Sequence, residues 1–152
     1  MRKIYIASSW KMVKTVRGMA GILRVLGHEV FDFTDPDSRP EGLSAFVFNA
    51  SDWAGKPLSE IGWLEFLQFE ATHKAFASDK AGLDWADTVI MVLPCGRSAH
   101  MEAGYAVGHG KDLYIIGELP KGEFDTMHLF ANAQFRLNEF DMMLSFLRED
   151  AT

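Results

Sequence analysis

The stretch that most constrains this chain is a short apolar run followed by a turn and a helical pattern. Residues 89–93 are apolar and rich in β-branched side chains, which predicts a strand buried on both faces. Pro94 and Gly96 are expected to end that strand, and Ser98 is the expected N-cap of a helix that runs to about His109. A strand, a tight turn and a helix N-terminus together form an anion or sugar site at the carboxyl edge of a parallel sheet.

One carboxylate in this predicted helix stands out, because small or apolar residues surround Glu102. Helical side chains lean toward the helix N-terminus, so Glu102 is expected to point back into the crevice above the strand. Most glutamates are solvated and belong to no site. Spacing alone therefore leaves both interpretations of Glu102 open.

The rest of the chain alternates predicted strands and helices. Residues 3–7 and 28–33 predict two strands, and apolar residues at helical spacing between them predict a helix that Gly27 ends. Residues 113–116 predict a further buried strand, and residues 134–137 predict an edge strand. This alternation predicts an α/β fold: a single-domain, doubly wound (Rossmann- or flavodoxin-like) sheet of about five mostly parallel strands with flanking helices.

The middle of the chain has a weaker pattern. Residues 45–48 fit either a short strand or an apolar plug, and the sequence does not decide between them. Pro57 suits the first turn of a helix through about Phe76, whose aromatic residues spread around it. Such a helix is expected to be covered on two sides, one of them by a partner subunit. Residues 78–86 predict a polar link, and residues 139–148 predict a terminal helix.

Composition limits the classes of protein that this chain can be. A length of 152 residues predicts one domain, 1–152, that is long enough to bury a core. The net charge of −6, with no basic cluster, argues against a nucleic-acid-binding surface. Cys95 is the single cysteine, which excludes an internal disulfide and fits a reducing compartment. No apolar run reaches the ~20 residues of a membrane span. The first strand follows the N-terminus too closely for a signal peptide, so a cytoplasmic protein is expected.

The central stretch also carries a resemblance to a known family. The segment PCGRSAHMEAGYA at 94–106, followed by GK at 110–111, resembles the signature of the nucleoside 2-deoxyribosyltransferase family. In that family a segment of the form Met-Glu-x-Gly-Tyr-Ala carries the nucleophilic glutamate. The resemblance includes IYIASSW at 4–10, which is like the family's first strand and substrate loop, and DKAG at 79–82. It covers most of the chain up to about Ile116, and it is most specific around the glutamate.

This resemblance implies an enzyme that cleaves the N-glycosidic bond of nucleosides or nucleotides without a cofactor. It makes Glu102 the nucleophile, Asp79 the group that handles the proton of the base, and Tyr5 a neighbour of the carboxylate or the sugar. The chemistry needs such a set, because a carboxylate captures the oxocarbenium-like sugar while a second group protonates the leaving base. The helix N-terminus is expected to keep Glu102 ionised. Without the resemblance, Asp79 would be interpreted as a turn residue before Gly82.

Further residues are candidates for substrate binding. Ser8, Ser9 and Trp10 occupy the first strand–helix loop, where a doubly wound fold binds its ligand. Trp10 either stacks on a base or packs in the core. Asp125 falls where the family carries a segment that is donated to the neighbouring subunit's site. The resemblance therefore also implies a homodimer or a larger homo-oligomer.

The chain departs from the family pattern at one position. Members that use free nucleosides carry an aspartate six residues before the nucleophile, and this chain has Gly96 there. Gly96, Arg97 and Ser98 offer backbone N–H groups, a guanidinium and a hydroxyl, which suit a 5′-phosphate. This resembles the related branch of nucleoside 5′-monophosphate N-hydrolases, in which water accepts the sugar. Transfer and hydrolysis both stay open, as does an ordinary surface role for Arg97.

The single cysteine, the histidines and the fold class each allow a further interpretation. Cys95 lies beside a predicted helix N-terminus, which fits either a reactive thiol with a lowered pKa or simple packing. The histidines show no metal-ligand spacing with cysteines or carboxylates, so no metal is predicted. A non-catalytic nucleotide-binding or sensing module on the same fold is the alternative function, because a fold alone does not give an activity.

Overall fold

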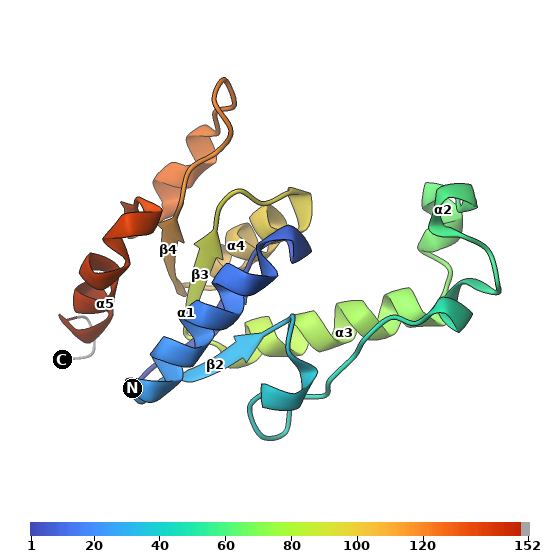
Figure 1. Cartoon of the computed structure of the whole chain (residues 1–152), viewed down its shortest axis with the longest axis horizontal. Coiled ribbons are helices and arrows are strands. Elements are labelled where there is room, and N and C mark those ends of the chain that lie inside the picture. Colours follow the sequence, from blue (N-terminus) through green and yellow to red (C-terminus); the bar gives the residue numbers. More distant parts are fainter. Residues whose placement is uncertain (150–152) are drawn as a thin grey trace.

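The computed structural model describes residues 1–149, so the predicted domain 1–152 extends past the described residues. Within them the chain forms one five-stranded sheet with helices on both faces (Figure 1). The strands are β1 (Lys3–Ala7), β2 (Glu29–Asp32), β3 (Thr88–Val92), β4 (Asp112–Ile116) and β5 (Ala133–Phe135). They pair in the order β2-β1-β3-β4-β5, and every pair is parallel. The predicted α/β doubly wound sheet is confirmed, with the strand order of the flavodoxin-like folds.

Two pairs of helices cover the two faces of this sheet. Helices α1 (Val13–Val25) and α5 (Phe140–Glu149) pack on one face, and α3 (Glu70–Trp85) and α4 (Arg97–Gly108) pack on the other. Because strand side chains alternate, Ile4 and Ile6 enter the first core cluster, while Tyr5 and Ala7 enter the second. The remaining helical segments are short: η1 (Trp10–Met12), η2 (Pro36–Ser38), η3 (Ala50–Trp53), η4 (Leu58–Glu60), α2 (Trp63–Phe66), η5 (Thr126–Phe130) and η6 (Leu137–Glu139).

The strand order reverses between β1 and β3, which brings the loops that follow these strands together. The hydroxyl of Ser8, just after β1, donates a hydrogen bond to the carbonyl of Val92 at the end of β3 (2.8 Å). In doubly wound folds ligands bind in the crevice at this reversal point. The topology therefore makes the ends of β1 and β3 the expected location of a ligand.

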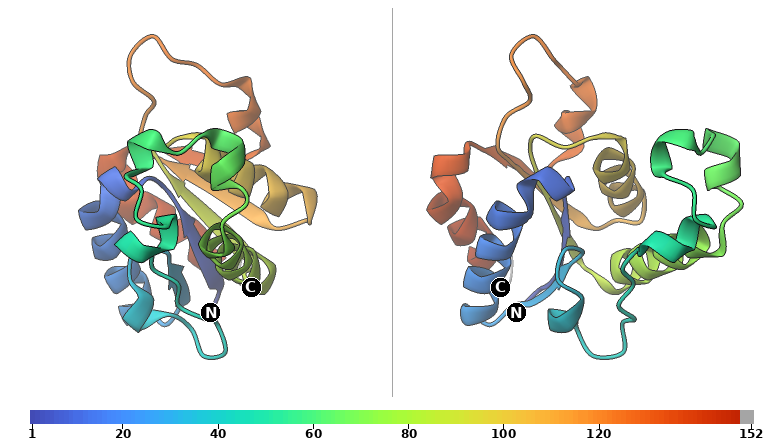
Figure 2. Two further views of the ribbon diagram at one scale, coloured as in Figure 1. Left: turned by 90° about the vertical axis from the view of Figure 1, so that its right-hand side faces the viewer. Right: turned by 45° about the vertical axis from the view of Figure 1, so that its right-hand side comes forward.

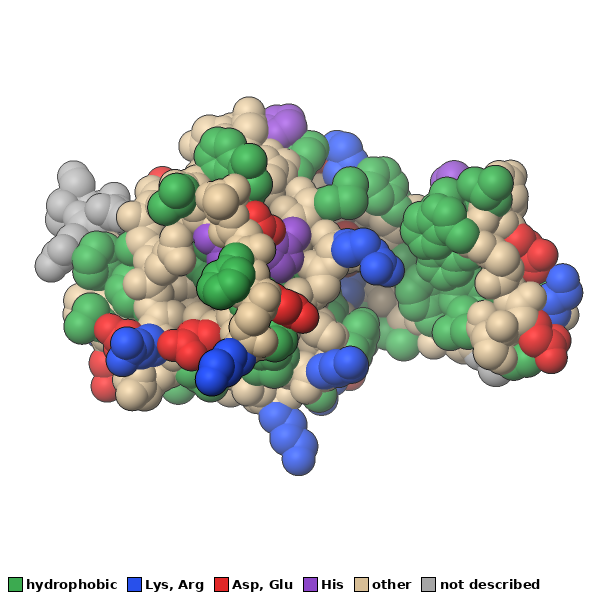
Figure 3. Space-filling model, turned by 90° about the horizontal axis from the view of Figure 1, so that it is seen from above, with side chains coloured by type: hydrophobic (Ala, Val, Ile, Leu, Met, Phe, Trp, Pro, Cys, Tyr) green, Lys and Arg blue, Asp and Glu red, His purple; other side chains and the backbone are tan. Residues whose placement is uncertain are grey.

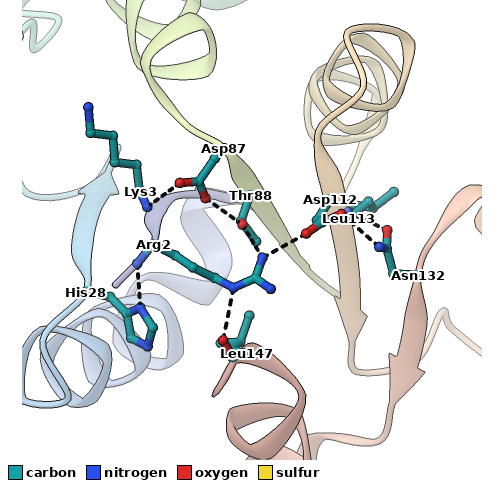
Figure 4. Close-up of polar contacts among 9 residues, drawn as sticks. All are labelled: Arg2, Lys3, His28, Asp87, Thr88, Asp112, Leu113, Asn132 and Leu147. Atoms are coloured by element: carbon teal, nitrogen blue, oxygen red, sulfur yellow. Dashed lines mark hydrogen bonds and ion pairs between the residues drawn. The ribbon is translucent and has the colours of Figure 1, made fainter. Parts of the chain in front are cut away.

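The opposite, amino edge of the sheet is held by a buried arginine (Figure 4). Arg2 donates through Nη1 to Thr88 Oγ1 and to Asp112 Oδ2, both at 2.8 Å. Its Nε donates to the carbonyl of Leu147 (3.0 Å), and the amide of Asn132 donates to Asp112 (2.9 Å). This network joins the start of β1 to β3, β4, β5 and α5, so it is a structural element of the sheet.

The helix predicted from Pro57 to Phe76 is wrong, and so is the polar link predicted over 78–86. Short turns η4 and α2 occupy the first part, and α3 then runs without interruption to Trp85. The glycine that suggested a link has a packing role, because a Cβ at Gly82 would lie 2.8 Å from the ring of Phe31. Gly82 therefore allows α3 to approach β2 closely.

Residues 45–69 form an arm that lies at the amino-terminal end of α3, away from the sheet (Figures 1 and 2). Trp53 is its centre and stacks on Phe48 and Phe66, with ring centroids 5.0 and 5.3 Å apart. Residues 45–48 form neither a strand nor a helix. They contribute Phe48 to this aromatic cluster, which confirms the apolar-plug interpretation.

The arm also leaves apolar side chains on its surface. Trp63, Leu64 and the nearby Phe76 of α3 are between 66% and 72% exposed. Figure 3 shows green side chains gathered on the arm, on the side that faces the body across a hollow. Among residues 1–149, none of the helices combines the length and the apolar character needed to cross a membrane.

Candidate active site

Three side chains from three different elements converge at the carboxyl edge of the sheet. They are Tyr5 of β1, Asp79 of α3 and Glu102 of α4. The Tyr5 hydroxyl hydrogen-bonds to the Glu102 carboxyl, and both groups feel the charge of Asp79. The structure thus brings together the three residues that the sequence proposed as catalytic, although 97 positions separate the first from the last.

The packing of α4 determines where Glu102 points. Ala99, Ala103 and Ala106 are buried against the sheet, and their small side chains let the helix lie close to it. Glu102 precedes Ala103 and is only partly exposed. Its interactions with Tyr5 and Asp79 agree with the predicted orientation toward the crevice.

The electrostatics of Glu102 differ from the sequence prediction. Burial raises its pKa, the neighbouring Asp79 charge raises it further, and the hydrogen bond from Tyr5 lowers it, which leaves the pKa at about 8. The expectation that the helix N-terminus keeps Glu102 ionised is therefore wrong. Glu102 is the sixth residue of α4, beyond the first turn in which the helix dipole acts, so burial dominates.

Asp79 lies in the interior of α3, so its interpretation as a turn residue is also wrong. Burial raises its pKa to about 6, against the opposing charge of Arg39. Since Asp79 and Glu102 interact, they titrate as a pair and not as independent groups. Near neutral pH the two carboxyls together hold about one proton.

Arg39 is the residue of this region that sequence reasoning missed. Its guanidinium lies over the ring of Phe31 (4.5 Å) and donates to the carbonyl of Ser44 (2.7 Å) and the hydroxyl of Ser78 (2.5 Å). Its Nε is buried and has no hydrogen-bond partner within the described residues. The only sequence signal was an arginine in a loop shortly after a buried strand.

The residues of the first loop lie where the sequence predicted, at the carboxyl end of β1. Ser8 is bonded to Val92, and Ser9 accepts a hydrogen bond as the N-cap of η1. Trp10 is 57% exposed and meets Phe33 edge-on (5.4 Å between ring centroids). The alternative that Trp10 packs in the core is wrong, and its ring lies at the surface, in the loop that follows β1.

The turn after β3 also lies at this edge, with one correction. Helix α4 begins at Arg97 with Gly96 as its N-cap, so the predicted N-cap at Ser98 is wrong. Because Gly96 has no side chain, no side-chain cap bonds the first N–H groups of the helix. Arg97 and Ser98 are exposed beside these groups. The turn therefore combines free N–H donors, a guanidinium and a hydroxyl.

Two other candidates have different surroundings. Asp125 caps η5, where its Oδ1 accepts from the backbone N–H of Met127 (2.8 Å), and it is not among the charges that shift the pKa of Glu102. Within one chain the structure therefore does not bring Asp125 to the carboxylate pair. Burial and the Glu102 charge raise the pKa of Cys95 to about 12, so the hypothesis of a reactive thiol with a lowered pKa is wrong.

Comparison with known proteins was informative at the level of structure. No family model and no curated protein matches the sequence. A 2-deoxyribosyltransferase from the psychrotolerant bacterium Bacillus psychrosaccharolyticus superposes with a TM-score of 0.56 and 24% identity, covering 87% of this chain and 84% of that one. The CMP N-glycosidase of Clostridium botulinum superposes with a TM-score of 0.51 and 15% identity, covering 95% of this chain and 96% of that one.

The chain has the fold of these two enzymes. The fold that the family resemblance implied is thereby confirmed over most of the chain. At these identities the likeness concerns the fold alone, and an activity must be inferred from the site itself.

Proposed function

We propose that this chain cleaves the N-glycosidic bond of (deoxy)nucleosides or their 5′-monophosphates through a covalent intermediate on Glu102. The observation that carries this proposal is the convergence of Glu102, Asp79 and Tyr5 at the reversal point of the sheet, with both carboxyl pKa values raised. Carboxyls with shifted pKa values in a crevice are typical of acid–base and nucleophilic chemistry. The fold that the chain shares with a deoxyribosyltransferase and a CMP N-glycosidase supports the same chemistry.

In the first step the ionised Glu102 carboxylate attacks C1′ of the sugar while the bond from C1′ to the base nitrogen breaks. The bonding electrons pass to the base, which takes the proton of Asp79. The single proton of the carboxyl pair lies more readily on Glu102. Positive charge developing at C1′ favours the ionised form of Glu102, and so shifts that proton toward Asp79 and the base. The Tyr5 hydrogen bond stabilises the carboxylate in this state.

In the second step an acceptor opens the ester between Glu102 and C1′. Water as acceptor gives hydrolysis, and a second base gives transfer; in both cases the proton of the acceptor returns to Asp79 and Glu102 leaves as a carboxylate. The proposed activity is therefore that of a nucleoside 2-deoxyribosyltransferase or of a nucleotide N-glycosidase. Neither route requires a cofactor.

The turn after β3 is the proposed phosphate subsite. Free N–H groups at the start of α4, together with Arg97 and Ser98, match the oxygens of a 5′-phosphate. The exposed Trp10 is proposed to stack on the base. Ser8 and Ser9, in the same loop after β1, are proposed to contact the substrate as well. These assignments favour nucleoside 5′-monophosphates over nucleosides.

We also propose that the chain acts as a homodimer or a larger homo-oligomer in the cytoplasm. The exposed Trp63, Leu64 and Phe76 offer an apolar surface for a second copy. Asp125, which lies away from the Glu102 of its own chain, is proposed to contact substrate in the neighbouring subunit. The cytoplasmic location is proposed from the single cysteine, Cys95.

A panel of nucleosides and 5′-monophosphates, analysed by chromatography with and without a second free base, tests this function. Release of free base supports hydrolysis, and a new nucleoside that appears only with the second base supports transfer. Glu102→Ala must abolish either product, whereas the matched control Glu123→Ala, at an exposed position, must not. Binding of nucleotides without any product would support the alternative of a non-catalytic sensing module.

A further inference from the structure

A second group of polar side chains lies between α4 and η5, away from the Tyr5, Asp79 and Glu102 group of the same chain. His100, Asp125 and His128 each contribute one ligand atom, and these atoms all lie within 4.8 Å of one another. His100 belongs to α4, whereas Asp125 and His128 belong to the segment of η5. The cluster forms only through the fold, since 24 residues separate His100 from Asp125 in the sequence.

The hydrogen bonds of His100 fix its orientation. Its Nδ1 lies 2.8 Å from the carbonyl oxygen of Gly96, and a carbonyl only accepts, so Nδ1 carries the proton. In the neutral ring Nε2 therefore presents its lone pair, and it points at Nε2 of His128, 2.8 Å away. A backbone carbonyl that holds one ring nitrogen so that the other can bind a metal is the common outer-shell arrangement of histidine ligands.

Asp125 adds an oxygen to the two ring nitrogens. Its Oδ1 is held by the backbone N–H of Met127 (2.8 Å). Its Oδ2 lies 3.9 Å from Nε2 of His100 and is the oxygen that remains for a cation. The local backbone therefore orients the carboxylate as well as the ring of His100.

We propose that His100, Asp125 and His128 form a binding site for a divalent transition-metal ion, with Zn²⁺ as the best match. Two imidazole nitrogens and one carboxylate are a usual zinc ligand set, whereas Mg²⁺ and Ca²⁺ prefer all-oxygen sets. Tetrahedral zinc ligands lie about 3.3 Å apart. The separations of 2.8 Å and 3.9 Å bracket that value, and the atoms of Asp125 and His128 lie within 4.8 Å of each other, so side-chain rotations can bring all three onto one ion.

The cation replaces the proton that lies between the two rings. Without it, Nε2–H of His128 donates to His100; with it, both Nε2 atoms bind the cation and the proton of His128 resides on Nδ1. Water fills the fourth position. The cluster borders a largely apolar hollow of about 350 Å³, whose walls include Met91, Met101 and Phe130. Few competing polar groups therefore surround the ion.

This site is separate from the proposed catalytic group. His100 and Glu102 are two positions apart on α4, which places them about 200° apart around the helix axis. A metal at His100 would tie the η5 segment to α4 without touching Glu102. The inference does not depend on the proposed chemistry at Glu102, but it does compete for Asp125: a carboxylate that binds the metal is not the one that reaches substrate in the neighbouring subunit.

Calorimetric titration of Zn²⁺ into the tag-free, chelator-treated full chain tests the site. We expect one Zn²⁺ per chain, and His100→Ala and His128→Ala should each weaken binding at least about a hundredfold, since even outer-shell changes weaken metal sites 10–100-fold. His73→Ala and His109→Ala are matched controls outside the cluster and should bind like the parent chain. Co²⁺ should give the visible absorption of a tetrahedral ion in the parent chain and lose it in His128→Ala.

The opposite results would overturn the proposal. If the parent chain does not bind Zn²⁺ in the micromolar range, or if His128→Ala binds it as tightly, the two histidines are only a hydrogen-bonded pair. Circular dichroism of His128→Ala and of the more conservative His128→Gln shows that any loss of binding comes from a folded chain.

Discussion

Both edges of the sheet bury charged side chains, but the amino edge pairs opposite charges and the carboxyl edge brings two carboxyls together. At the amino edge, Arg2 is buried but donates to Thr88, Asp112 and the carbonyl of Leu147 (Figure 4). At the carboxyl edge, Glu102 and Asp79 are drawn close together, and burial raises both pKa values. The amino edge therefore stabilises the fold, while the carboxyl edge holds an unfavourable charge arrangement. Such arrangements are typical of functional sites, where stability is lower than the fold allows.

The largest expected effect is the loss of activity when the carboxylate at the centre of this comparison is removed. Glu102→Ala should reduce base release by at least about a thousandfold, since the covalent step loses its nucleophile. Its circular dichroism spectrum should match that of the parent chain, because the loss of one hydrogen bond from Tyr5 is offset by the removal of a buried carboxyl. Activity above a small residual level in a steady-state assay would remove Glu102 from the mechanism.

The second prediction concerns the shared proton of the carboxyl pair. The plot of kcat/KM against pH should be bell-shaped, with limbs near about 6 and about 8. Below the lower limb both carboxyls are protonated and no nucleophile exists; above the upper limb both are ionised and no proton reaches the base.

Asp79→Asn tests the assignment of this proton. The variant should lose roughly 10²–10³-fold in kcat/KM and should no longer lose activity above the upper limb, because the acid is absent. A substrate whose base leaves without protonation should be affected much less. An unchanged alkaline limb in Asp79→Asn would show that another group carries the proton.

The third prediction tests the amino edge. Arg2→Met removes one partner of a buried polar network and should lower the free energy of unfolding by about 3 kcal/mol in urea titrations. Activity per folded molecule should be unchanged, because Arg2 lies at the edge opposite the site. The exposed Arg148→Met is the matched control and should change stability little. If Arg2→Met lowers kcat but not the free energy of unfolding, the amino edge does not have the purely structural role assigned to it.

The fourth prediction is that a carboxyl-edge substitution stabilises the chain. The folded pKa of Glu102, about 8, exceeds its ordinary value of 4.5. The stability that the protonated carboxyl contributes is therefore fully present below about 4.5 and is lost as pH rises toward about 8. Glu102→Gln does not titrate, so it should be more stable than the parent chain by about 2 kcal/mol at pH values above about 8 and nearly equal in acid. If the parent chain and Glu102→Gln have equal free energies of unfolding above about pH 8, the Glu102 carboxyl is not buried as assigned.

The smallest expected effect concerns the phosphate subsite. Arg97→Ala should lower kcat/KM for 2′-deoxynucleoside 5′-monophosphates about tenfold, as expected for a charge-assisted hydrogen bond at an exposed position. The matching nucleosides are the internal control and should react as before. Equal turnover of both substrate types, with no effect of Arg97→Ala, would assign the chain to transfer between free nucleosides.

The sheet could be predicted from residue patterns, whereas Tyr5, Asp79 and Glu102 were grouped through the family resemblance. Runs rich in β-branched residues, such as residues 88–92, have few alternatives to a buried parallel strand. Glu102 was identifiable because a lone carboxylate among small residues has an unusual environment on any helix that packs on a sheet. Its raised pKa was not predictable, since the burial and the approach of Asp79 come from α3, an element of uncertain extent in the sequence.

The errors arose where local patterns carry two meanings. The aromatics of residues 57–76 looked like a helix covered on two sides, but Phe66 and Phe69 among them pack around Trp53 in the arm. Gly82 looked like a helix breaker, yet it makes room for Phe31. Arg39 and the His100 cluster depend on the path of loops between elements, which spacing along the chain does not encode.

The most direct measurement of the central claim is mass spectrometry of the intact chain mixed with a 2′-fluorinated nucleoside 5′-monophosphate. Fluorine beside C1′ disfavours the oxocarbenium-like transition state and slows release of the sugar from the enzyme. We predict that the chain gains the mass of the sugar phosphate, that the adduct maps to the peptide with Glu102, and that Glu102→Gln gains none. Base release without an adduct, or an adduct on another residue, would contradict a covalent role for Glu102.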